Sequence, residues 1–180
     1  LSFLKREHSF FSRDLEDAFE LLSTEIRGSK MLVIGGAGTI GSSYIKAALN
    51  YKPSLLVVVD INENGLTELI RDLRSSPDQY IPEILVTYPL SFDSNAFRKL
   101  FLNYGPFDIV ANFAAHKHVR SEKDIYSIEA LLENNLLKAK NFLRKNFVEL
   151  TKFSEVKKAF ETFFHDTRFF FNKFKWYGFE

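Results

Sequence analysis

The stretch Met31-Leu-Val-Ile-Gly-Gly-Ala-Gly-Thr-Ile-Gly41 decides how this chain is expected to fold. Four apolar residues lead into glycines at positions 35, 38 and 41, and a segment of helical character follows. This order predicts a buried parallel strand, a tight turn and the N-terminus of a helix. The free backbone N–H groups and partial positive charge of such a helix N-terminus suit a diphosphate.

A second apolar run supports a nucleotide site. Leu55-Leu-Val-Val-Val59 ends at Asp60, 19 residues after Gly41. An acidic residue about 20 residues beyond the glycines, at the end of the second strand, is placed to hold the diol of a ribose. A glycine triplet alone also fits an ordinary strand–turn–helix connection, and Asp60 alone also fits a helix cap. Together the two features indicate a dinucleotide site, and the cap and ribose roles can coexist.

Composition narrows the classes of function. The chain has 180 residues, a formal net charge of +1 and no cysteine. These values argue against an electrostatic nucleic-acid binder, a disulfide framework and thiolate chemistry. Neither a membrane span nor a signal peptide is visible in the sequence, so we expect a cytoplasmic protein. The chain begins with Leu1 rather than Met, so we expect its natural N-terminus to be trimmed or unseen.

The rest of the pattern alternates strands and helices. Apolar spacing predicts a helix from Ser12 to Ile26 within an N-terminal extension, residues 1–28. Strands are expected at 31–34, 55–59, 84–87 and 107–113, and helices at 40–49, 66–73, 94–103 and 125–146. The alternation predicts an α/β fold, a Rossmann-like doubly wound parallel sheet over residues 29–146. The ligand is then expected at the carboxyl ends of the strands.

The C-terminal segment departs from this pattern. Ten of the 20 phenylalanines lie at or after Phe147. We expect residues 147–180 to form a Phe-rich helical tail whose apolar surface needs a partner, as in a homo-oligomer. No β-branched run supplies the fifth strand that should follow the long helix. We therefore expect a discontinuity near Asn146–Phe147, with a middle segment missing.

A further motif follows the fourth strand, Asn112-Phe-Ala-Ala-His-Lys-His-Val119. The small Ala114 and Ala115 let a cofactor pass close to the backbone, and Lys117 beside them can pair with a substrate diphosphate. His116 and His118, as an isolated pair, are most simply loop histidines. No third ligand accompanies them, so no metal site is expected.

Together these motifs resemble the extended short-chain dehydrogenase/reductase superfamily. They are most similar to bacterial polysaccharide-biosynthesis nucleotide-sugar 4,6-dehydratases of the UDP-N-acetylglucosamine 4,6-dehydratase type. The resemblance is carried by residues 33–42, 59–66 and 112–123, and Asn135-Leu-Leu-Lys-Ala-Lys-Asn141 fits a helix of that family. It implies a lyase with tightly bound NAD or NADP. Such an enzyme oxidises C4 of a UDP-sugar, eliminates water across C5–C6 and reduces C6, in bacterial surface polysaccharide biosynthesis.

The resemblance also assigns roles to individual residues. The cofactor pyrophosphate would be held by Gly35, Gly38, Thr39, Ile40 and Gly41. The adenosine ribose would be bound by Asp60, Ile61 and Asn62, and adenine would be flanked by Ser91 and Phe92. Ala114, Ala115 and His116 would line the nicotinamide side, and Lys117 and His118 would face the substrate. The Asp60 carboxylate favours NAD over NADP because it repels a 2′-phosphate, although Arg71 or Arg74 could offset this.

The sequence departs from the family at its catalytic motifs. The Thr-Asp-Lys segment and the Tyr-x-x-x-Lys pair, whose Tyr takes a proton from the sugar hydroxyl, do not occur in the chain. The catalytic residues are therefore unknown, and the chain as written is expected to bind a dinucleotide without the chemistry. The alternatives are a non-catalytic dinucleotide-binding remnant and an epimerase or reductase of the same superfamily. We favour the 4,6-dehydratase with a missing segment.

Overall fold

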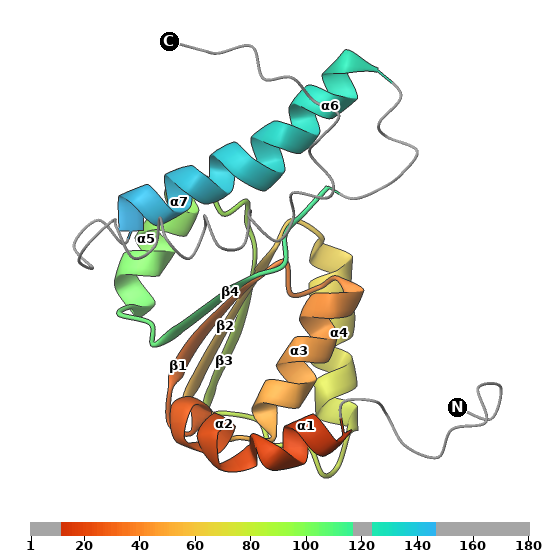
Figure 1. The fold of residues 1–180 in the computed structure, drawn as a ribbon, viewed down its shortest axis with the longest axis vertical. Helices are drawn as coiled ribbons and strands as arrows, with labels where there is room; N and C mark the ends of the chain where they lie inside the picture. The colour runs from red at the N-terminus through yellow and green to blue at the C-terminus, as the bar shows by residue number, and fades with distance from the viewer. Residues whose placement is uncertain (1–11, 117–123, 147–180) are drawn as a thin grey trace, which may run out of the picture. The chain divides into compact units, whose positions relative to one another are not determined.

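The computed structural model describes residues 12–116 and 124–146 (Figure 1). The chain divides into two units, Leu1–Ala139 and Lys140–Glu180, and the sheet and the candidate site lie in the first. The described strands form one parallel sheet in the order β3-β2-β1-β4. Their bounds are β1 Lys30–Ile34, β2 Leu55–Asp60, β3 Ile84–Pro89 and β4 Ile109–Asn112. The predicted Rossmann-like α/β fold is confirmed.

The register of the sheet brings the carboxyl ends of the strands level. Ile34, the last residue of β1, pairs with Val59 of β2 and with Asn112 of β4. Asp60, the last residue of β2, pairs with Pro89 of β3. The connections that leave these ends therefore start from the same edge of the sheet, where a doubly wound fold binds its ligand.

Helices cover both faces of the sheet. Figure 1 shows α3 (Thr39–Leu49) and α4 (Glu63–Ser75) side by side on one face and α5 (Asn95–Tyr104) on the other. The inner strands β1 and β2 are buried almost throughout, which explains their continuous apolar runs. Helix α4 packs on β2 and β3 through an apolar stripe at helical spacing, formed by Leu66, Leu69 and Leu73.

Three elements differ from their predicted bounds. The N-terminal helix is divided at Ala18 into α1 (Ser12–Asp17) and α2 (Phe19–Ile26), and Ile26 enters the core. Helix α4 begins earlier than predicted, because Asn62 caps it by accepting a hydrogen bond from the Gly65 N–H. Strand β4 is shorter than residues 107–113. The side chain of Asp108, just before it, accepts a hydrogen bond from Lys30 N at 2.8 Å.

The long C-terminal helix is interrupted by a π-helical turn. It runs as α6 (Ile125–Leu132), η2 (Glu133–Leu137) and α7 (Lys138–Asn146). π turns inside α-helices are rare and recur at functional sites. Apolar spacing could not predict this interruption, because a single wider turn hardly changes the spacing of apolar residues along the helix.

Several predictions lie outside the described residues. They include the substrate role of Lys117 and His118, the discontinuity after Asn146 and the helical tail over residues 147–180. Within the described part of the chain, no helix is long and apolar enough to cross a membrane.

Candidate functional site

The glycine turn between β1 and α3 is closely packed against neighbouring backbone. Gly35 has φ +76°, a conformation that favours glycine, and its N–H donates to the Val59 carbonyl at 2.7 Å. A Cβ on Gly35 would lie 2.4 Å from Ala114 N, and one on Gly41 would lie 2.3 Å from the Gly35 carbonyl oxygen. The protein's own packing therefore excludes a side chain at both positions.

The middle glycine of the turn differs from the other two. Gly38 is exposed and has φ −74° and ψ 163°, which any residue can adopt. A Cβ there would be in ordinary contact with the Gly35 carbonyl oxygen at 3.6 Å. Gly38 is the N-cap of α3 and offers no side-chain hydrogen bond to its first turn. Backbone N–H groups of that turn are thus left for a ligand, and the protein's own packing leaves room for a Cβ at Gly38.

Asp60 connects the end of β2 to the glycine turn. Its half-buried carboxylate accepts one hydrogen bond from Ala37 N at 3.0 Å and another from Asn62 N at 2.9 Å. The α4 cap is therefore Asn62, and Asp60 instead holds the glycine turn to its own strand. Each carboxylate oxygen keeps a further lone pair that can accept from a ribose hydroxyl. Ile61 follows with 74% of its side chain exposed at this edge.

The turn after β3 contains the predicted adenine-side residues. Phe92 is buried as a whole residue, and Ser91 beside it is half-buried. The Ser91 hydroxyl donates to the Asp93 carboxylate, and Lys138 Nζ lies 3.2 Å from the other Asp93 oxygen. These partners, Ser91 first and Lys138 second, hold the pKa of Asp93 below its usual value. Sequence reasoning missed both Asp93 and Lys138.

The loop after β4 contains the predicted nicotinamide-side residues. Ala115 and His116 are exposed, and Ala114 N donates to the Asn112 side chain at 3.0 Å. Asn135, in the π turn, accepts from His116 N at 2.8 Å and donates to the His116 carbonyl at 2.9 Å. One amide side chain therefore fixes both backbone groups of His116. The sequence placed Asn135 on a helix but gave no signal of this contact, which joins residues 19 apart.

Two described tyrosines have a shifted pKa, and both shifts are upward. Burial raises the pKa of Tyr44, whose ring packs on Phe113 with centroids 5.0 Å apart. A hydrogen bond with Tyr104 at 2.7 Å raises the pKa of Tyr88. A tyrosine base needs a lowered pKa, so neither residue suits that role. In the described ranges, no three His, Asp or Glu side chains are grouped to hold a metal ion.

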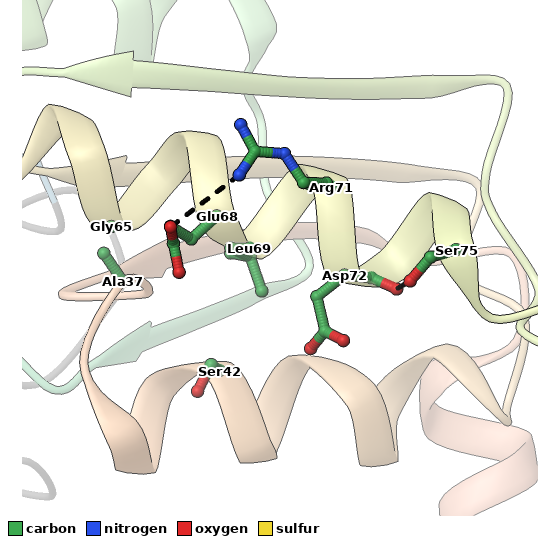
Figure 2. Close-up of a pocket in the computed structure, with 8 residues that line it drawn as sticks. All are labelled: Ala37, Ser42, Gly65, Glu68, Leu69, Arg71, Asp72 and Ser75. Atoms are coloured by element: carbon green, nitrogen blue, oxygen red, sulfur yellow. Dashed lines mark hydrogen bonds and ion pairs between the residues drawn. The ribbon is translucent and has the colours of Figure 1, made fainter.

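A hollow of about 540 Å³ lies beside the glycine turn, between α3 and α4 (Figure 2). It touches the turn at Ala37, but most of its lining comes from α4. Figure 2 shows Asp72 directed toward α3, where it pairs with Lys46, and Arg71 directed away from α3 and paired with Glu68 at 3.8 Å. Its charged groups have partners within the protein, so we assign the ligand to the strand edge rather than to this hollow.

The fold and this edge define the chain as a Rossmann-type α/β protein. A family model described as "Polysaccharide biosynthesis protein" matches residues 31–158, more than half of the chain. The chain belongs to this polysaccharide biosynthesis family.

One curated relative has the same description as the family, and two solved structures share the fold. The probable polysaccharide biosynthesis protein EpsC of Bacillus subtilis is 26% identical over 120 residues, covering 67% of this chain and 19% of that protein. Pen from Bacillus thuringiensis has a similar structure, with TM-score 0.53, 23% identity and coverage of 66% of this chain and 34% of Pen. A putative D-mannonate oxidoreductase from Haemophilus influenza, with bound NAD, also has a similar structure. Its TM-score is 0.54 at 13% identity, and the match covers 72% of this chain and 52% of the oxidoreductase. The structural matches support the Rossmann fold.

The chain spans less than a fifth of the length of the curated relatives it matches, at 17% and 19%.

Proposed function

We propose that this domain binds NAD at the carboxyl edge of its sheet. One observation carries the proposal, the contrast between Gly38 on one side and Gly35 and Gly41 on the other. Packing excludes a side chain at Gly35 and Gly41, whereas a Cβ at Gly38, the N-cap of α3, would make only an ordinary contact with the Gly35 carbonyl oxygen. A pyrophosphate lying against that turn would explain why a glycine stands at position 38, where packing within the protein would accept a larger residue. The putative D-mannonate oxidoreductase, of similar fold, binds NAD.

The binding roles that we propose are those that the resemblance assigns to these residues. Gly35, Gly38 and Gly41, with Thr39 and Ile40, would surround the pyrophosphate. Asp60, Ile61 and Asn62 would meet the adenosine ribose, with Asp60 accepting from its hydroxyls. Ser91 and Phe92 would flank adenine. Ala114, Ala115 and His116 would line the nicotinamide, and Lys117 and His118 would face the substrate.

The charges near the expected ribose support NAD rather than NADP. Asp60 ends β2, and Glu63 follows in the first turn of α4. Two carboxylates disfavour a 2′-phosphate. Arg71 lies nine residues beyond Asn62 along α4, about 13 Å at the rise of an α-helix. Arg71 also pairs with Glu68, and Arg74 lies farther along the same helix, in its last turn. The two carboxylates therefore carry the proposed preference for NAD.

We further propose that the whole protein is a nucleotide-sugar 4,6-dehydratase acting on a UDP-N-acetylglucosamine-like substrate, as a cytoplasmic homo-oligomer. Membership of the polysaccharide biosynthesis family and the Lys117-His118-Val119 motif support this assignment. When bound, NAD would accept a hydride from the sugar and return it. The described residues would bind and orient this cofactor. The catalytic Tyr-x-x-x-Lys pair would then lie in the missing middle segment expected near Asn146–Phe147.

The binding proposal is tested by calorimetric titration of the purified chain with NAD. Gly38→Ala should lower the affinity for NAD by at least about tenfold, because a methyl group would occupy the pyrophosphate position. Its melting temperature should stay close to that of the wild type. Ser43→Ala, an exposed change on the same helix, is the matched control and should bind NAD normally. Absence of NAD binding by the wild type, or normal binding by Gly38→Ala, would refute the proposal.

The dehydratase assignment is tested on the protein purified from its natural source. An intact mass well above 20.9 kDa would place further sequence in the protein. Incubation with UDP-N-acetylglucosamine should then give a 4-keto-6-deoxy sugar. A C4 epimer would favour the epimerase alternative, and an intact mass near 20.9 kDa without turnover would favour the dinucleotide-binding remnant.

A further inference from the structure

One helical turn contacts the loops at both outer edges of the sheet. Among the strands that the structure describes, β3 and β4 are the outermost, with β2 and β1 between them. Asn135 holds the backbone of His116 after β4, and Lys138, one turn later, pairs with Asp93 after β3. These two loops are the ones expected at opposite ends of a bound dinucleotide. The turn from Asn135 to Lys138 is therefore placed to set their separation.

The connection to the β3 turn is a chain of charged and polar contacts. Lys138 Nζ lies 3.2 Å from one Asp93 oxygen, and the other Asp93 oxygen accepts from the Ser91 hydroxyl. The Lys138 side chain is 26% exposed and that of Asp93 is 40% exposed. Ser94, next in the chain, caps α5 by accepting from Phe97 N, and its own N–H donates to the Ser91 carbonyl. The lysine thus reaches a turn that is already ordered within itself.

We propose that Lys138 is a positioning residue for the adenosine end of the cofactor, acting through Asp93 on the turn at Ser91–Asp93. This inference rests on the proposed binding of NAD. Lys138 does not touch the nucleotide. It fixes the orientation of the turn relative to the helical turn that carries Asn135. A partly exposed ion pair adds little to global stability, so its removal should affect ligand affinity and local order more than unfolding.

The test uses the full chain with two ligands, NAD and ADP-ribose, of which ADP-ribose lacks the nicotinamide. Lys138→Met removes the charge and keeps much of the side-chain length. It should lower the affinity for both ligands by the same factor, about three- to fivefold, the scale of one partly exposed ion pair. Asp93→Asn should have a similar effect, and the double variant should lose no more than either single variant. Lys138→Arg should restore most of the affinity.

The control is Lys99→Met, which removes an exposed lysine from α5 and should leave both affinities unchanged. Unchanged affinities in Lys138→Met would overturn the proposal. A loss confined to NAD would also overturn it, because the effect would then lie at the nicotinamide end. An equal loss in Lys99→Met would show a general charge effect and overturn it as well.

A separate measurement distinguishes failure of this proposal from failure of NAD binding. Amide hydrogen exchange of the ligand-free protein reports the order of the turn directly. Lys138→Met should speed exchange at the Asp93 and Ser94 amides while the inner strands stay protected. If the wild type binds neither ligand, the proposed function fails, and this exchange then decides whether Lys138 orders the turn. Unchanged exchange would overturn the positioning role.

Discussion

The inner and outer strand ends of the sheet are held in different ways. At the ends of β1 and β2, the glycine turn and Asp60 are joined by backbone proximity and by hydrogen bonds from Ala37 N and Asn62 N. At the ends of β3 and β4, the loops are held by the side chains of Lys138 and Asn135, which come from a helix later in the sequence. The inner half of the site is thus built from adjacent strand–turn–helix units. The outer half depends on one later helical turn.

This difference predicts how each half should respond to substitution. Changes at the inner ends should affect the folding of the whole sheet, because β1 and β2 form its buried centre. Changes at the outer ends should loosen single loops while the sheet remains folded.

The largest loss of stability, measured as the free energy of unfolding, is expected from Gly41→Ala. In an exposed helix this change would stabilise the protein by up to about 1 kcal/mol. Here the new methyl group would lie 2.3 Å from the Gly35 carbonyl oxygen, so we expect a loss of about 3 kcal/mol in the free energy of unfolding. Urea denaturation measures it, with Gly38→Ala as the matched control. Similar stability for the two variants would contradict the distinction between these glycines.

A smaller global effect is expected from Asp60→Ala. The substitution leaves Ala37 N and Asn62 N without their carboxylate partner, and one charge-assisted hydrogen bond contributes about 2 kcal/mol. Urea denaturation should show a loss of that order, and Asp60→Asn, which keeps one acceptor oxygen, should lose less. If the alanine variant unfolds like the wild type, Asp60 does not hold the glycine turn.

A local effect is expected from Asn135→Ala. The change removes both hydrogen bonds to His116, at a cost of about 1 kcal/mol for a loop already partly exposed. Hydrogen exchange at the His116 amide should become faster, while exchange in β1 and β2 stays slow. Asn64→Ala, an exposed change on α4, serves as the control. Faster exchange throughout the sheet would show that the inner and outer ends are coupled.

The smallest loss of stability is expected when the pH is lowered. Hydrogen bonding from Ser127 N lowers the pKa of Asp124, the N-cap of α6, and the contacts with Ser91 and Lys138 lower that of Asp93. A carboxylate whose pKa is lower in the folded state stabilises the fold fully above its ordinary value of about 3.9. This stabilisation is lost as the pH falls through the folded-state pKa. The protection factor of the Ser127 amide, which compares its exchange with the intrinsic rate at the same pH, should therefore fall below about pH 4.

Asp124→Asn is the control for this acid effect. The neutral amide can still accept from Ser127 N but cannot be protonated in this range. Its Ser127 protection factor should lack this acid-dependent fall. A fall equal to that of the wild type would assign the effect to another group.

Much of the fold could be predicted from the sequence because its signals are local. The buried run Met31–Ile34, the glycines and the second run ending at Asp60 each reflect a requirement of one strand or one turn. Their order along the chain predicts the parallel sheet, which the structure confirms. The less regular elements could not be predicted, since the break at Ala18 and the π turn at Glu133–Leu137 leave apolar spacing nearly unchanged.

The sequence by itself determined the sheet, the glycine turn and the acidic residue at the end of β2. Only the tertiary structure decided that Asp60 holds the glycine turn, that Asn62 caps α4, and that Asn135 and Lys138 reach His116 and Asp93. The physical reason is the distance along the sequence over which each kind of interaction acts. Backbone conformation and burial leave a pattern in neighbouring residues, whereas a hydrogen bond between distant segments requires only that the fold bring a donor and an acceptor together.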